Sequence, residues 1–115
     1  MKYNKISFVG SMLLLIFSNQ AISAGGDSGT RLIHNIYTNP VGIKIHAIPG
    51  QDWNNPDNCT NSSALVIENT HINRDVLVSQ ILASKSLNRE MSAWLVGCKQ
   101  WNNDTFPVVY GIYFK

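Results

Sequence analysis

Apolar and polar residues alternate in short segments along most of this chain, and residues that favour turns separate the segments. Residues 43–48 show the pattern well, because Ile43, Ile45 and Ala47 alternate with mostly polar neighbours. Such alternation predicts a strand with one buried face. Segments rich in strand-forming residues predict five strands in all, at residues 32–37, 43–48, 64–68, 91–96 and 106–114.

One segment between the third and fourth strands has helical spacing instead. Asn73 is a favourable N-cap, Asp75 suits the first turn, and Lys85 and Asn88 mark the end of the helix. The apolar stripe of this helix comprises Val76, Leu77, Val78, Ile81 and Leu82. We expect the helix to cover one side of the sheet.

The predicted element order is therefore β-β-β-α-β-β, a mostly β fold with one helix. Five strands with a helix between the third and fourth match the OB-fold, a small Greek-key barrel, and this is the fold we predict. A two-layer α+β sandwich would use the same elements. Trp94 lies in the fourth strand and is expected in the core. Tyr110 and Tyr113 fall on opposite faces of the last strand, so at least one should be exposed.

Residues 1–24 have the three parts of a secretory signal peptide. Lys2 and Lys5 precede an apolar run, and small residues follow near the end of the segment. The run of about ten apolar residues is too short to span a membrane, which takes about 20, so no stable membrane insertion is expected. The signal predicts export to the periplasm or the exterior, with cleavage after Ser23 or after Ala24.

The rest of the chain is long enough for one small domain. Residues 25–30 are polar and rich in glycine, and we expect them to form a flexible leader ahead of a single domain at residues 31–115. The net charge of +2 comes from Lys2 and Lys5, so the exported part is formally neutral. Nucleic acids and anionic membrane surfaces attract clustered Lys and Arg, so neither is an expected partner.

Cys59 and Cys98 are the two cysteines of the chain. In an oxidising compartment such a pair most often forms a disulfide, and we predict one. A metal pair or a catalytic thiol are the alternatives. A metal site would need more ligands at short spacing, but His34, His46 and His71 stand apart from one another, so neither a metal nor a cofactor is expected.

Two loops repeat a short pattern, a tryptophan followed by two asparagines, and each lies near a cysteine. A disulfide between the cysteines would hold both loops on the same part of the molecule. An aromatic ring packs against the C–H groups of a sugar while amides bind its hydroxyls, which suggests glycan binding. The alternative is that the tryptophans pack on the core and the asparagines only form turns. The candidate residues are Trp53, Asn54, Asn55, Trp101, Asn102 and Asn103.

No familiar motif supports an enzyme. Ser28 lies in a Gly-Asp-Ser-Gly sequence similar to that around some serine-protease nucleophiles, but it stands at the start of a domain far too small for that fold. A glycosidase needs two carboxylates that converge on a cleft. The spacing of Asp52, Asp57, Glu68 and Asp104 does not require any pair to converge, so we expect no catalysis.

The stretch from Val66 to Tyr113, about half of the exported part, resembles the binding subunits of one-plus-five bacterial toxins, such as subtilase cytotoxin and the pertussis-like toxins. The likeness lies in a strand at 64–68, a helix carrying residues 77–83, a strand that closes at Gly97-Cys98, and an aromatic last strand. It is a likeness of layout without a signature motif. The resemblance implies an OB-like barrel, a ring of identical subunits and a glycan-binding surface pocket.

These observations predict an exported, non-enzymatic domain that binds a glycan through the loops around Trp53 and Trp101. The toxin-subunit resemblance implies that the domain could assemble as a homo-oligomeric ring. The alternative is a periplasmic or secreted interaction protein, such as an inhibitor, which would use an exposed strand edge or the loop at residues 51–63.

Overall fold

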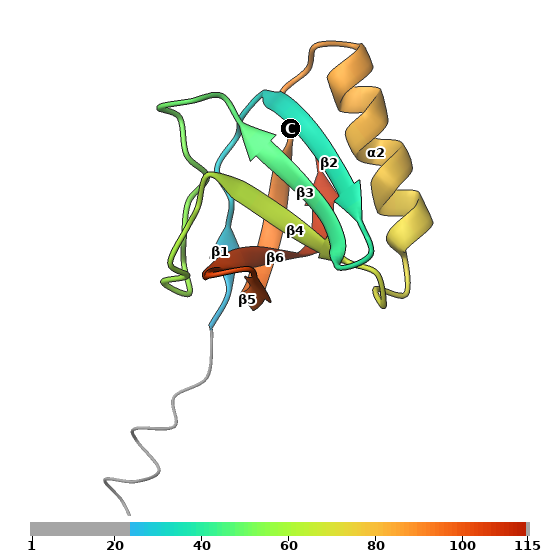
Figure 1. The fold of residues 1–115 in the computed structure, drawn as a ribbon. Helices are drawn as coiled ribbons and strands as arrows, with labels where there is room; N and C mark the ends of the chain where they lie inside the picture. Colours follow the sequence, from blue (N-terminus) through green and yellow to red (C-terminus); the bar gives the residue numbers. More distant parts are fainter. Residues whose placement is uncertain (1–23, 115) are drawn as a thin grey trace, which may run out of the picture.

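The computed structural model describes residues 24–114, so nearly all of the predicted signal peptide lies outside the described residues (Figure 1). The mostly β prediction is confirmed, with one helix between the third and fourth of the expected strands and an additional short strand before them. The elements are β1 (Gly26–Asp27), β2 (Ile33–Asn39), β3 (Gly42–Ala47), β4 (Ala64–Glu68), α2 (Arg74–Ser86), β5 (Ser92–Trp101) and β6 (Asp104–Tyr113).

The strands form one six-stranded sheet in the order β1-β5-β6-β4-β3-β2. Neighbouring strands are antiparallel, except that β4 and β6 are parallel, with Val66 opposite Val108. The helix α2 follows β4 and lies along one side of the sheet, where it contacts β2, β4 and β6 (Figure 1). The helix α2 and the strand β5 together form the connection from β4 to its parallel neighbour β6.

Residues 25–30 are not a flexible leader, which corrects the expectation from their composition. The strand β1 pairs with β5, and the fully buried Ser28 donates its backbone N–H to the Ala93 carbonyl at 2.8 Å. Just before β2, Arg31 and Met91 exchange two backbone hydrogen bonds of 3.0 and 2.9 Å. Residues 26–39 therefore pair first with β5, through β1, and then with β3, through β2. This continuous segment joins the two ends of the sheet.

The core consists of two clusters on opposite faces of β4. Leu65 and Ile67 belong to the larger cluster, which also contains Leu77 and Ile81 of α2. Alternate β4 residues belong to a smaller cluster that comprises Ala64, Val66, Trp101 and Phe106. Burial on both faces explains why this strand is a continuous apolar run without alternation.

Two predicted core assignments differ from the structure. In the predicted helical stripe, Leu77 and Ile81 are buried, but Val76 and Leu82 are exposed. At 100° per residue those two positions lie well away from the buried face. Trp94, expected in the core, is 43 % exposed because its side of β5 faces outwards.

The predicted disulfide between Cys59 and Cys98 is present, with a Cα–Cα distance of 5.7 Å. It ties the loop between β3 and β4 to β5. Thr60 and Thr105 reinforce this attachment, since the backbone N–H of each donates to the hydroxyl of the other at 2.9 and 2.7 Å. The long loop is thereby fixed against the hairpin of β5 and β6.

Candidate functional site

Trp53, one of the two expected sugar-stacking residues, is a core residue. Its ring is only 2 % exposed and belongs to the larger cluster, and its Nε1 donates to the Ile45 carbonyl at 3.1 Å. Asn55 is a turn former, because its side chain accepts from the Cys59 N–H and donates to the Cys59 carbonyl. Asn54 is exposed, and its backbone N–H donates to Ser28. This loop offers no aromatic face to a ligand.

Trp101 is also buried, at 4 % exposure, but in the smaller cluster on the other face of the sheet. The Lys44 ammonium lies 4.6 Å from the centre of its ring and 4.2 Å from that of Phe106. Burial lowers the pKa of Lys44, and the nearby Asp104 carboxylate partly opposes this shift. The protein's own lysine therefore takes the cation–π position over Trp101.

The two asparagines after Trp101 form the tight turn between β5 and β6. Asn102 has a positive φ of 56°, which asparagine tolerates better than most residues, and both Asn102 and Asn103 are exposed. The disulfide does bring the two predicted loops together. However, Trp53 and Trp101 belong to separate clusters, so they do not form one aromatic site.

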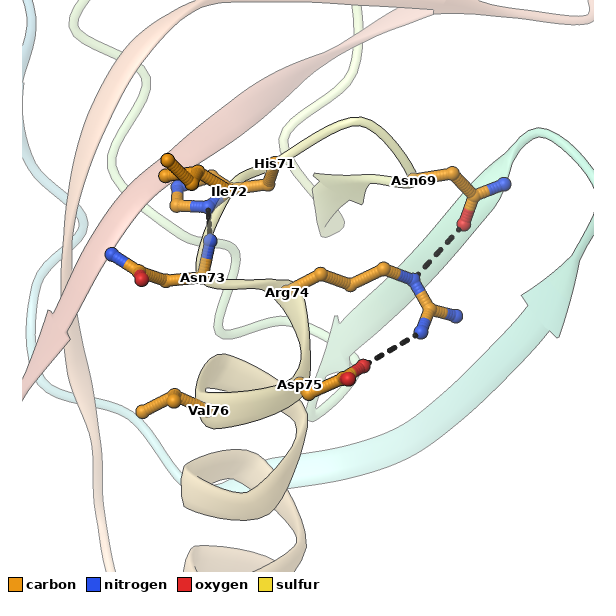
Figure 2. A pocket seen from close by; sticks show the side chains of 7 residues that line it. All are labelled: Asn69, His71, Ile72, Asn73, Arg74, Asp75 and Val76. Carbon is orange, nitrogen blue, oxygen red and sulfur yellow. Dashed lines mark hydrogen bonds and ion pairs between the residues drawn. The ribbon is translucent and has the colours of Figure 1, made fainter.

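A different surface, where β4 leads into α2, is hollowed (Figure 2). We call it the turn surface, and it consists of the side chains of residues 69–76 together with Tyr110. It contains a hollow of about 300 Å³, whose lining comprises Asn69, His71, Ile72, Asn73, Arg74, Asp75 and Val76. A neighbouring hollow of about 330 Å³ shares His71, Ile72 and Asn73 and adds Tyr110.

His71 fixes the shape of the turn. Its Nδ1 accepts the backbone N–H of Asn73 at 3.0 Å, which leaves Nε2 to donate to the Tyr110 carbonyl at 2.9 Å. Its own backbone N–H bonds to Glu68 at the end of β4, and its carbonyl accepts from Arg74 at the start of α2. The His71 imidazole thus joins the start of α2 to the strand β6, and the His71 backbone N–H adds a hydrogen bond to the end of β4.

The polar side of the turn surface is a short chain of side chains, which Figure 2 shows to the right of the helix start. Arg74 donates through Nε to Asn69 at 3.2 Å and pairs through Nη1 with Asp75 at 3.4 Å. Asn69 in turn donates to the Pro40 carbonyl at 2.6 Å, in the turn between β2 and β3. These contacts hold the polar groups in place while Asp75 stays exposed.

The apolar side of the turn surface is open to solvent. Ile72 is 94 % exposed, Tyr110 is 68 % exposed, and Val76 is more than half exposed. In Figure 2, Ile72 and Val76 project to the side away from Arg74. The exposure of Tyr110 confirms that at least one of the last-strand tyrosines faces solvent.

Sequence reasoning missed the turn surface because it combines one continuous segment with Tyr110, which is distant in the sequence. A signal was present in Ile72, an aliphatic residue between polar neighbours and outside the helical stripe. The position of Tyr110 beside that segment follows from the parallel pairing of β4 with β6, which the residue pattern did not predict.

Residues 24–114 contain no candidate metal site and no candidate membrane-spanning helix. There, no three His, Cys, Asp or Glu side chains gather closely enough to hold a metal ion. No helix in that range is both long and apolar enough to cross a membrane. Comparison with models of protein families, with curated proteins and with solved structures finds no match to this chain.

Proposed function

We propose that this chain is an exported, non-enzymatic binding domain whose turn surface contacts a protein partner. The observation that carries this proposal is the nearly complete exposure of Ile72, beside the exposed Val76 and Tyr110. Single exposed apolar residues are common, but a group with a polar margin is characteristic of interaction surfaces. The partner therefore presents an apolar pocket or ridge with hydrogen-bonding groups around it.

The rigidity of the turn surface also supports this function. His71 fixes the backbone beneath Ile72, and Arg74 is held between Asn69 and Asp75. A surface that is ordered before binding loses less conformational entropy when the partner arrives. Ile72 is thus held in position to act as the apolar anchor of the interface.

The use of the carboxylates favours a binding protein over a hydrolase. Asp57 accepts backbone N–H groups from Gly25 at 3.3 Å and Gly97 at 2.7 Å. Asp104 accepts hydrogen bonds from Thr60 and Asn61. Both acids stabilise the attachment of the long loop, so their positions have a structural explanation that does not require catalysis.

We further propose that the fold is OB-like. Support comes from the helix between β4 and β5, the parallel pair β4–β6, and the Arg31–Met91 bridge that joins the ends of the sheet. A closed small barrel of this kind is consistent with the toxin-subunit layout. A ring of identical subunits is accordingly part of the proposal, and light scattering on the oxidised protein tests it separately from binding.

Glycan binding is the second candidate function, and Tyr110 is the observation that favours it. Since Trp53 and Trp101 are buried, neither can stack on a sugar, whereas the exposed Tyr110 ring lies beside Asn73 in one hollow. Aromatic faces next to amides suit sugar recognition. If the partner is a glycan, Tyr110 stacks on the sugar, as was expected of Trp53 and Trp101.

The test compares aspartate substitutions at two exposed apolar positions, one on the turn surface and one away from it. Ile72→Asp changes the turn surface, and Leu82→Asp is the matched control on another side of α2. With a partner purified from the cell envelope or the medium, Ile72→Asp should weaken binding at least about tenfold, the cost of losing one interface anchor. Leu82→Asp should bind like the native protein. Equal binding by all three proteins would reject the turn surface.

A glycan array with the same proteins tests the second candidate. If the ligand is a sugar, Tyr110→Ala should abolish the array signal, and Tyr110→Phe should retain most of it, because stacking needs only the ring. An array without any signal, together with a protein partner sensitive to Ile72→Asp, would leave protein binding as the function.

A further inference from the structure

The start of the described chain lies in a slot that only glycine fits. Gly25 has a φ of 73°, and a Cβ there would lie 2.7 Å from the Leu95 carbonyl oxygen. A Cβ on Gly26 would lie 2.8 Å from the Cβ of Pro56. Ala24, one residue earlier, is exposed. The chain therefore enters the fold at Gly25, between β5 and the loop that carries Pro56.

A carboxylate lies at the entrance of this slot. The Oδ1 atom of Asp57 accepts the backbone N–H of Gly25 at 3.3 Å, and its Oδ2 atom accepts that of Gly97 at 2.7 Å. The adjacent Cys98 bonds to Cys59, two residues beyond Asp57, so the disulfide holds the carboxylate in place. One oxygen of a well-anchored acid thus faces the nitrogen of Gly25.

We propose that processing cuts the chain between Ala24 and Gly25 and that Asp57 binds the α-ammonium group that this cut creates. An export peptidase that cleaves after small residues would hydrolyse the Ala24–Gly25 amide with one water molecule. The C–N bond breaks, Ala24 gains a carboxylate, and the Gly25 nitrogen gains protons to become an ammonium. The amide hydrogen bond to Asp57 then becomes an ion pair.

The position of the cut decides whether this pair forms. The sequence permits cleavage after Ser23 as well as after Ala24. After the earlier cut, the positive charge would lie on the nitrogen of Ala24, one residue before Gly25, where the chain is exposed. The Gly25 nitrogen would then remain a neutral amide. Only the chain that begins at Gly25 places its charge directly beside Asp57 and ties its free end to β5.

The proposal rests on the proposed export, and the intact mass of the protein made from the full chain in a bacterial host separates the two. A mass that begins at Gly25, lower by two hydrogens for the disulfide, is the expected result. A mass that begins at Ala24 would overturn the cleavage position while export stands. An uncut chain retained inside the cell would overturn the export proposal and the cleavage site together.

Thermal unfolding of prepared chains tests the ion pair without any cleavage step. A chain that begins at Gly25 is compared with the same chain acetylated at its α-amino group. The structure already accommodates an amide at this position, so acetylation removes the charge without adding a clash. Acetylation should lower the Tm by roughly 2–8 °C, as expected for a partly buried charge pair in a small domain. An unchanged Tm would overturn the ion pair.

Two substitutions show whether the charge acts through Asp57. In Asp57→Asn, which keeps an acceptor for Gly97, acetylation should no longer change the Tm. In Asp52→Asn, an exposed acid of the same loop, the effect of acetylation should be the same as in the native chain. An acetylation effect that persists in Asp57→Asn would overturn the assignment. If that variant does not fold, the acetylation result on the native chain still decides.

Discussion

Replacing Ser28 with alanine removes a buried hydrogen-bond acceptor from the segment that connects β1 to β2. The Ser28 hydroxyl accepts the backbone N–H of Ala93 at 2.8 Å and donates to the Gly29 carbonyl at 2.8 Å, and the residue is fully buried. In Ser28→Ala the Ala93 N–H has no acceptor in the interior. An unsatisfied buried donor costs about 1–3 kcal/mol, and each kcal/mol lowers the Tm of a domain of this size by about 4–8 °C.

Circular dichroism during heating and urea titration measure this effect. The control is Ser86→Ala at the exposed end of α2, which should change stability by less than about 0.5 kcal/mol. The urea m-value should stay the same in both variants, because the folded surface does not change. A Tm for Ser28→Ala equal to that of Ser86→Ala would show that residues 25–30 are a loose leader, and it would refute their pairing with β5.

Three further predictions concern the disulfide, the core and pH. Reducing the Cys59–Cys98 bond should lower stability by about 4 kcal/mol, as calculated from the entropy of a loop of 39 residues, and a Tm change below about 5 °C would contradict this. Trp53→Phe should cost about 1–3 kcal/mol, measured by urea unfolding, because it removes the indole donor to the buried Ile45 carbonyl. Burial lowers the pKa of His46, so its contribution to stability is present above about pH 6.5 and is lost as the pH falls. His46→Gln should therefore lose less stability than the native protein between pH 7 and 5.

Much of the local structure was predictable because it depends on patterns within short segments. Residues 64–68 were predicted as a strand with the bounds that the structure shows, since a continuous apolar run suits a strand buried on both faces. The helix begins at Arg74, directly after the predicted N-cap Asn73. The pairing of the two cysteines followed from their number and from the expected compartment.

The errors share one physical cause, which is that burial depends on neighbours distant in sequence. Composition marked residues 25–30 as loose, but β5 offers them a free edge with which to pair. Trp94 was expected in the core and Trp53 at a binding surface. The structure reverses both assignments. Trp94 lies on the outward face of β5, and the long loop between β3 and β4 carries Trp53 into the larger core cluster.

The sequence by itself determined the mostly β composition, the helix between the third and fourth expected strands and the identity of the cysteine pair, since strand alternation, helical spacing and cysteine count are local or compositional properties. Tertiary structure alone decided that Gly25 meets Asp57 and that Ile72 lies beside Tyr110. The first depends on the pairing of β1 with β5 and on the disulfide that holds the loop of Asp57, and the second depends on the parallel pairing of β4 with β6. Those features depend on the pairing of segments that are far apart in the sequence, and no local pattern specifies which segments pair.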